Sequence, residues 1–107
     1  MPGMVLVVTG PRASGKTTAT AQLQTLLPAW TVVHADEPFH ALMHASGGRW
    51  RGREPELYAL VLEHVLGLVR SLAATGERVL LDGTVLPRRL APLLRPPAPA
   101  VQVLVLL

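Results

Sequence analysis

The stretch Gly10-Pro11-Arg12-Ala13-Ser14-Gly15-Lys16-Thr17-Thr18 decides the fold of this sequence. It fits G-x-x-x-x-G-K-[ST], the phosphate-binding pattern known as Walker A. Before it, residues 4–9 form a short apolar run rich in valine, which predicts a buried parallel strand. After it, apolar residues at helical spacing predict a helix over residues 17–27, which Pro28 closes. Strand, glycine loop and helix are the context that the motif requires, so we predict a nucleoside triphosphate site at residues 10–18.

The residue types of this loop match the chemistry of phosphate binding. Gly10 and Gly15 allow backbone conformations in which successive N–H groups turn toward an anion. The helix that opens near Lys16 adds unpaired N–H donors and the positive end of its dipole. We expect the Lys16 ammonium to reach the β- and γ-phosphates and the Thr17 hydroxyl to bind Mg²⁺. Thr18 belongs to the same loop but is expected to serve helix packing more than the metal.

Length and composition predict one small α/β domain over residues 1–107. Half of the residues are hydrophobic, yet no window of about 18 uninterrupted apolar residues suggests a membrane span. The start, Met1-Pro2-Gly3, lacks the basic and long apolar regions of a secretion signal. The absence of cysteine excludes a disulfide framework and is compatible with the reducing cytoplasm, where we expect the protein to reside.

The charge pattern argues against a nucleic-acid partner. The net charge is +3, and the cations are scattered apart from Arg49, Arg51 and Arg53 in one segment and the pair Arg88-Arg89. A nucleic-acid surface would gather them on one face or along one helix. We interpret the arginine content mainly as compositional bias.

Asp36 follows the second predicted strand, residues 31–33, and therefore lies at the edge where open α/β sheets bind ligands. Two roles fit this position. As a helix cap, it would begin the helix that Pro38 tolerates in its first turn. As a general base, it would accept a proton from a substrate hydroxyl that faces the γ-phosphate. Both roles can hold together.

The segment after Asp36 contains two further candidate features. His40 and His44 are four residues apart, as are Asp36 and His40, which makes a metal site conceivable although no further ligand is indicated by spacing. Residues 45–53 (ASGGRWRGR) break the helical pattern with three glycines. They form either a solvated basic loop or a mobile flap whose arginines and Trp50 grip an anionic or aromatic substrate.

The run at residues 78–82 is the third predicted strand and ends in Asp82, which fits the Walker B pattern. An aspartate at this place orients Mg²⁺ directly or through water. The next residue is Gly83, whereas ATPases of the motor type commonly have a water-activating glutamate there. Its absence favours phosphoryl transfer to a bound acceptor over hydrolysis.

The rest of the chain completes an alternating pattern. A long helix is predicted from Pro55 to about Thr75, with Tyr58 and a row of aliphatic residues on its apolar face. A short helix follows over residues 88–94, and residues 101–107 form a fourth strand. Right-handed crossovers make all four strands parallel, and we expect all four apolar runs to be buried between helices, as in a three-layer P-loop fold.

Taken together, these motifs resemble the amino-terminal part of small P-loop kinases. The chain is most similar to the chloramphenicol phosphotransferase-like group, with zeta-toxin-type kinases sharing the layout. The resemblance covers nearly the whole chain and includes residues 27–30, the triplet His34-Ala35-Asp36 and the run ending at Asp82. It implies a strand order of 2-3-1-4-5, ATP with Mg²⁺, and a small hydroxylated acceptor. In the resembling enzymes an aspartate that matches Asp36 is the proposed base.

The sequence departs from that family after the fourth strand. Such kinases continue into an arginine-bearing lid and a fifth strand, whereas this sequence stops at Leu107. We therefore expect a truncated chain whose last strand has an open edge and can self-associate. Two other functions remain open: a nucleotide-binding remnant without catalysis, and a nucleoside triphosphate hydrolase.

Overall fold

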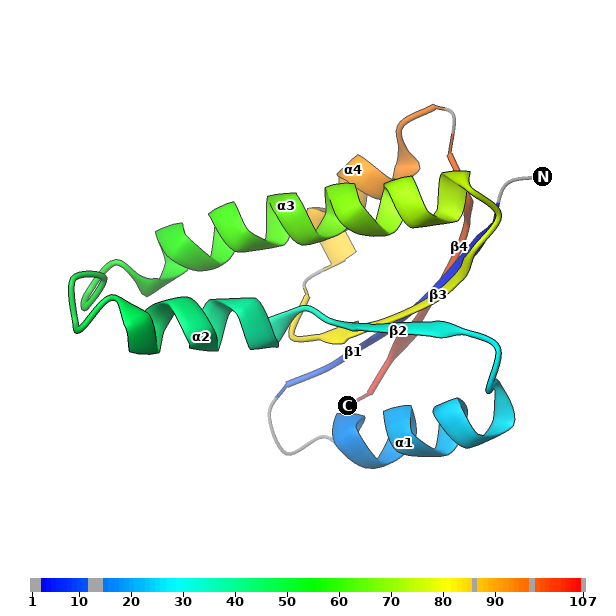
Figure 1. Ribbon diagram of the computed structural model, residues 1–107, viewed down its shortest axis with the longest axis horizontal. Coiled ribbons are helices and arrows are strands. Elements are labelled where there is room, and N and C mark those ends of the chain that lie inside the picture. The colour runs from blue at the N-terminus through cyan, green and yellow to red at the C-terminus, as the bar shows by residue number, and fades with distance from the viewer. Residues whose placement is uncertain (1–2, 12–14, 86, 97, 107) are drawn as a thin grey trace.

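A computed structural model describes residues 3–11, 15–85, 87–96 and 98–106. Four parallel strands form one sheet in the order β2-β3-β1-β4, with helices on both of its faces (Figure 1). The strands are β1 (Met4–Thr9), β2 (Thr31–His34), β3 (Arg78–Gly83) and β4 (Ala100–Val105). The α/β fold and the predicted order of these four strands are thereby confirmed.

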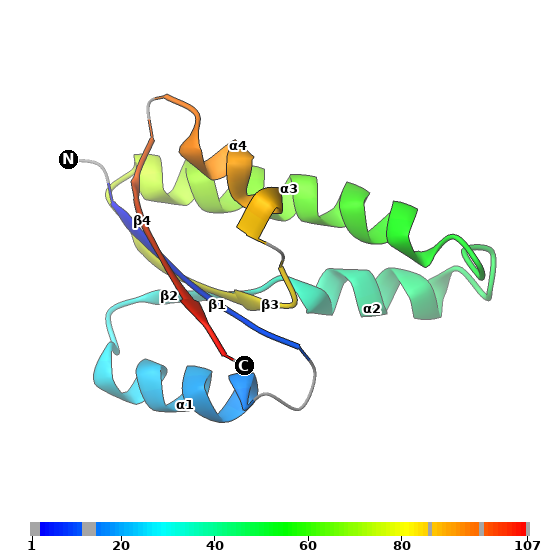
Figure 2. The same cartoon turned by 180° about the vertical axis from the view of Figure 1, so that it is seen from behind.

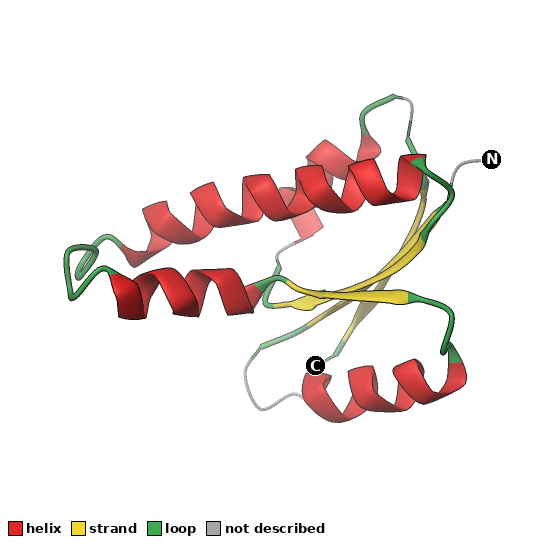
Figure 3. Cartoon of the chain, in the orientation of Figure 1, coloured by secondary structure: helices red, strands yellow, loops and turns green. Residues whose placement is uncertain are grey.

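One or two helices separate each strand from the next along the chain. They are α1 (Lys16–Leu26), α2 (Asp36–Ala45), α3 (Glu54–Ala74), the short 3-10 helix η1 (Pro87–Leu90) and α4 (Ala91–Leu94). α1 lies on one face of the sheet, and α3 and α4 lie on the other (Figure 3). α2 continues outward from the carboxyl end of β2 and runs beside α3 as a helical hairpin.

The core lies between α3 and the two central strands. Valine and leucine side chains of β1 and β3 interlock there with one face of α3, and Gly76 at φ 94° ends that helix as its sequence predicts. The buried residues of α3 recur at helical spacing: Leu57, Val61, Leu62, Val65, Leu66, Val69 and Ala73. α3 is long and apolar enough to pass a length-and-composition criterion for a membrane span, but this buried face is what a core helix shows as well.

The expectation that all four strands are buried was wrong for β4. Val103, Leu104 and Val105 are each more than 40% exposed, whereas β1 and β3 are mostly buried and β2 is half-buried. Hydrophobic composition marks a strand but does not say how many layers cover it. In the described part of the chain, β4 pairs with β1 alone, and Figure 2 shows it at the edge of the sheet.

Candidate functional site

Of the two loop glycines expected to adopt conformations that favour glycine, Gly15 does so, whereas Gly10 is not among the glycines with a positive φ. Gly15 adopts φ 87° directly before α1, a left-handed conformation that favours glycine. Lys16 is the first residue of that helix, and its Nζ lies 3.4 Å from both the Pro11 carbonyl oxygen and the Thr84 Oγ1. The predicted contributions of Arg12, Ala13 and Ser14 lie outside the described residues.

A pocket of about 380 Å³ opens beside this loop at the carboxyl edge of the sheet. Lys16, Thr17 and Asp82 all line it, so the predicted phosphate and magnesium residues face one space. The His34 Nδ1 lies 3.2 Å from the Asp82 Oδ2 and holds that carboxylate in place. The buried Thr20 Oγ1, which also belongs to this pocket, has no hydrogen-bond partner among the residues that the structure describes.

Asp36 is held by contacts from two other elements. It is the first residue of α2, but Ala35 occupies the cap position and no side chain caps this helix, so the predicted capping role was wrong. Instead, its carboxylate turns toward the segment after β3. The Thr84 N lies 3.3 Å and the Thr84 Oγ1 3.3 Å from the Asp36 Oδ2, and the Tyr58 hydroxyl lies 2.9 Å from Oδ1.

A second pocket, of about 560 Å³, lies between α2, α3 and η1. Its wall is largely aromatic and apolar, formed by Phe39, His40, Pro55 and Tyr58. Phe39 meets both of its aromatic neighbours edge to face, with ring centroids 5.3 Å from Tyr58 and 5.4 Å from His40. Glu54 and Arg89 bring one charge of each sign to this pocket.

Asp36 and His40 border both pockets. On one side of Asp36 lie the phosphate lysine and Asp82, and on the other lie the aromatic wall and Arg89. Thr84 bridges the two sides, because its hydroxyl is near both Lys16 and Asp36. The arrangement can therefore hold a phosphorylated ligand and a hydroxyl compound on opposite sides of one carboxylate.

The pKa of Tyr58 reflects this environment. Burial, the hydrogen bond to Asp36 and the negative charge of Asp36 raise the pKa of the Tyr58 hydroxyl above its ordinary value of 10.0. The positive charge of Arg89 acts in the opposite direction. The phenol is therefore a neutral hydrogen-bond donor throughout the physiological range.

Gly83 leaves no room for a side chain next to Asp36. A Cβ at this position would come within 2.7 Å of the Ala35 Cβ and 3.3 Å of the Asp36 Oδ1. The glycine therefore lets β3 pass close to the start of α2. A glutamate in its place, as in motor-type ATPases, could not be accommodated without a shift of Ala35 and Asp36.

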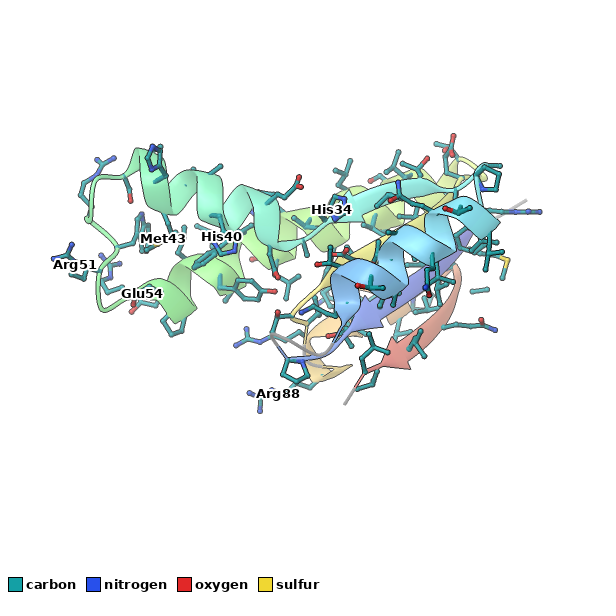
Figure 4. The ribbon with its side chains drawn as sticks, turned by 90° about the horizontal axis from the view of Figure 1, so that it is seen from below. His34, His40, Met43, Arg51, Glu54 and Arg88 are labelled. Carbon is teal, nitrogen blue, oxygen red and sulfur yellow. The ribbon has the colours of Figure 1, made fainter. Side chains whose placement is uncertain are left out.

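The basic loop, residues 46–53, is tied down by its own contacts. The Arg53 guanidinium stacks over the Trp50 ring at 4.6 Å and pairs with Glu56 at 3.0 Å, while the Arg49 Nε donates to the Ser46 carbonyl. Figure 4 shows Arg51 extending outward from the tip of the α2–α3 hairpin, whereas His40 lies between the two helices. Glu54 lies at the loop end of α3, where its Oε1 accepts from the Gly52 amide at 2.9 Å. These contacts favour the interpretation as a solvated loop over that as a substrate-gripping flap.

Two residues of the site, Tyr58 and Thr84, are not apparent from the sequence. The spacing predicts Tyr58 only as part of the apolar face of α3, and no motif indicates Thr84. A tyrosine within an otherwise aliphatic stripe is the one signal available, because its hydroxyl needs a partner when buried. Among the described residues, no three His, Asp or Glu side chains converge as a metal site, so the conceivable His40 and His44 site has no third ligand there.

Comparison with known families agrees with the geometry. The profile of a family described as an AAA domain matches residues 5–106. The chain belongs to this AAA domain family. Its P-loop is thus part of a nucleotide-binding domain. No curated protein matches this AAA domain in sequence.

Solved structures show the same fold. A protein assigned as a kinase from Chloroflexus aurantiacus matches with a TM-score of 0.80 and 18% identity, over 99% of this chain and 60% of its own. The APS kinase CysC from Mycobacterium tuberculosis, in a mutant form, has a TM-score of 0.73 and 19% identity, and the match covers 98% of this chain and 76% of the kinase. Thymidylate kinase from Candida albicans has a TM-score of 0.61 and 19% identity, and the match covers 77% of this chain and 40% of the kinase. This AAA domain therefore has a P-loop kinase-like fold and spans 60% of the length of the first of these structures.

Proposed function

We propose that this AAA domain is the nucleotide-binding part of an ATP-dependent phosphotransferase that moves the γ-phosphoryl group to a hydroxyl of a small molecule. The observation that carries the proposal is the position of Asp36 between two pockets. One pocket contains the phosphate lysine, and the other has a wall suited to an organic acceptor. A hydrolase would need only the pocket that contains the phosphate lysine.

Each residue has a distinct role in this proposal. Lys16 and the N-terminal amides of α1 bind the β- and γ-phosphates as fixed positive charge. Asp36 accepts the proton of the acceptor hydroxyl as its oxygen attacks the γ-phosphorus. Holding both reactants on either side of one carboxylate supplies proximity, which is a major part of catalysis in phosphoryl transfer.

The residues present also fit a magnesium ion. Thr17 and Asp82 offer hydroxyl and carboxylate oxygens to the same pocket, and Mg²⁺ prefers such oxygen ligands. When bound, the ion supplies positive charge that neutralises the phosphates. The contact of His34 with Asp82 orients the carboxylate toward that task.

The acceptor class follows from the resemblance rather than from the pocket alone. Similarity to chloramphenicol phosphotransferase-like kinases supports an antibiotic alcohol as the first candidate. A nucleoside, a sugar and a peptidoglycan precursor are the alternatives. We further propose a cytoplasmic location, where ATP is available.

Nucleotide binding is tested with Lys16→Ala. Loss of the charge-assisted phosphate contact should weaken ATP·Mg²⁺ binding by about 1.5–3 kcal/mol, or roughly ten- to a hundredfold. Isothermal titration calorimetry measures this directly. Arg78→Ala is the matched control, because Arg78 is an exposed cation at the opposite end of β3. Equal affinities for the wild type and Lys16→Ala would contradict the site.

Phosphoryl transfer is tested with isotopically labelled ATP and a panel of chloramphenicol, thymidine, glucose and UDP-N-acetylglucosamine. For the acceptor that is phosphorylated, Asp36→Asn should reduce turnover by about 10²- to 10⁴-fold and leave ATP affinity nearly unchanged. Retained turnover would remove Asp36 from the role of base. Release of inorganic phosphate without a labelled acceptor would favour hydrolysis, and binding without either product would favour a non-catalytic nucleotide-binding domain.

A further inference from the structure

Tyr58 lies where α3 faces the first residue of α2. Its ring packs edge to face against Phe39, with an interplanar angle of 76°, and its hydroxyl points at the Asp36 carboxylate. The residue is half-buried. Ring packing fixes the direction of the hydroxyl, because a tyrosine side chain has few rotatable bonds.

The Tyr58 hydroxyl has two acceptors within reach. Its oxygen lies 2.9 Å from the Asp36 Oδ1 and 2.7 Å from the Thr84 carbonyl oxygen. A phenol has one hydrogen and can donate to only one of them at a time, but its oxygen can also accept a hydrogen bond. The two distances therefore describe two alternative hydrogen-bond arrangements of the same atoms.

The charge on Asp36 selects between these arrangements. While Asp36 is ionised, it can only accept, and Tyr58 donates to its Oδ1. Once Asp36 is protonated, its carboxyl group becomes a donor. If the Tyr58 hydroxyl still pointed at it, two O–H groups would face each other and one of the two hydrogens would lack an acceptor. If Tyr58 instead donates to the Thr84 carbonyl, its oxygen is free to accept from Asp36.

We propose that Tyr58 is a positioning residue that keeps the Asp36 carboxyl hydrogen-bonded both before and after it receives the proton of the acceptor. This inference rests on the proposed function. In the step, the acceptor O–H bond breaks and its proton goes to Asp36 Oδ1. The acceptor oxygen forms a bond to the γ-phosphorus as the bond from that phosphorus to the leaving nucleoside diphosphate breaks. No proton leaves Tyr58, whose hydroxyl only rotates from Asp36 to the Thr84 carbonyl.

The neighbouring contacts strengthen this assignment. The Thr84 hydroxyl lies 3.3 Å from the other carboxylate oxygen, Oδ2, and the Thr84 amide lies 3.3 Å from Oδ2 and 3.4 Å from Oδ1, so the orientation of Asp36 is fixed from a second direction. The Thr84 carbonyl and amide both take part, which links the two hydrogen-bond arrangements through one residue. Asp36 and Tyr58 are half-buried, so a polar group left without a partner there carries part of the cost of a buried one. A base that is hydrogen-bonded in both protonation states avoids that cost during proton transfer.

The first test follows the ionisation of Tyr58, which is the sole tyrosine of the sequence. Phenolate absorbance is recorded directly after rapid pH jumps, before unfolding, in the wild type, Asp36→Ala and Glu56→Gln. We expect Asp36→Ala to ionise at a lower pH than the wild type, because it removes a hydrogen bond and a negative charge. Glu56→Gln removes an exposed carboxylate of the same helix and should titrate like the wild type. Identical titration of the wild type and Asp36→Ala would overturn the contact.

The second test separates positioning from binding. With the acceptor found in the panel, Tyr58→Phe should lower kcat by about ten- to a hundredfold and change the acceptor KM much less. Glu56→Gln should retain both constants. An unchanged kcat, or a loss confined to KM, would overturn the role.

These tests also distinguish the two proposals. If no compound of the panel is phosphorylated, the proposed function fails while the titration still decides whether Tyr58 contacts Asp36. If transfer occurs with normal kcat in Tyr58→Phe, the function stands and the positioning role falls. Should Tyr58→Phe fail to fold, the titration of the wild type against Asp36→Ala still decides whether Tyr58 contacts Asp36, and without that contact the positioning role falls.

Discussion

Thr84 joins the phosphate side and the acceptor side of the candidate site. Its hydroxyl lies 3.4 Å from the Lys16 Nζ and 3.3 Å from the Asp36 Oδ2. A phosphate that draws Lys16 toward itself leaves this hydroxyl to Asp36 alone. Thr84 is therefore in contact with both the phosphate lysine and the proposed base.

The raised pKa of Tyr58 makes stability depend on pH. Below pH 10 the phenol is protonated in both the folded and the unfolded chain, so its contribution is fully present. As the pH rises above 10, the unfolded chain loses the proton while the folded chain retains it, and stability falls. Denaturant unfolding should therefore show a steeper loss of stability above pH 10 in the wild type than in Tyr58→Phe. Parallel curves for the two proteins would contradict the shift.

At the level of residues, the sequence predicted the phosphate side of the site better than the acceptor side. Lys16 belongs to the Walker A pattern and Asp82 to the Walker B pattern, and both patterns can be recognised from residues that are close together in the sequence. The contact between Tyr58 and Asp36 joins two helices and depends on how α2 and α3 pack. The capping role of Asp36 failed for a similar reason, because contacts with Thr84 from another element determine where its carboxylate points.

At the level of elements, β1 is joined to the segment after β3 by a pair of buried hydrogen bonds. The Thr9 Oγ1 donates to the Val85 carbonyl at 2.7 Å and accepts from the Val85 amide at 2.9 Å. Thr9 directly precedes the phosphate-binding loop, and Val85 directly follows Thr84. This pair therefore fixes the spacing between the two segments that carry Lys16 and Thr84.

Replacing Thr9 tests this connection. Thr9→Val keeps the shape of the side chain but leaves both backbone groups of Val85 buried without a partner, which should cost about 2–4 kcal/mol of unfolding free energy. Thr9→Ser retains the hydroxyl and should cost clearly less. Chemical denaturation measures both variants. A Thr9→Val protein as stable as Thr9→Ser would show that the hydrogen bonds contribute little.

The helices and strands themselves were largely predictable, because hydrophobic periodicity and the glycine and proline residues that end an element are local signals. The predicted helix over residues 17–27 corresponds to Lys16–Leu26, and the strand after Arg78 continues one residue further to Gly83. Packing was less predictable: Leu26, one of the apolar residues whose spacing predicts this helix, is 74% exposed. Helical spacing identifies a stripe, but only the neighbouring layer decides which of its residues are covered.

At the level of the molecule, the outer edge of β4 is the feature most open to association. Its backbone groups on that side face no strand in the described part of the chain, and its exposed valine and leucine residues carry no charge. A polypeptide of these 107 residues should therefore self-associate at tens of micromolar, as measured by size-exclusion chromatography with light scattering. Val103→Lys with Val105→Lys should shift it toward the monomer. A wild-type monomer at these concentrations would contradict the expectation.

The strand order was predictable because right-handed crossovers and the P-loop topology leave few alternatives. The coverage of β4 was not, since its composition resembles that of the buried strands β1 and β3. Its uncharged run, in which Gln102 is polar, is consistent with burial between helices and with an exposed edge alike. Only the arrangement of the other elements separates the two cases.

The pairing of β1 with β4 has a consequence for folding. Met4 lies opposite Ala100, so the strand that leads into the phosphate-binding loop finds one of its two neighbours almost a full chain length away. Contacts so distant in sequence carry a large loop-closure entropy and slow the folding of a domain. During synthesis, β1 is made before β3 and β4, the two strands that pair with it. Its backbone N–H and C=O groups therefore have no strand partner until those strands have been made. The nucleotide loop is thus attached to a strand that is among the first to be made and among the last to be completed.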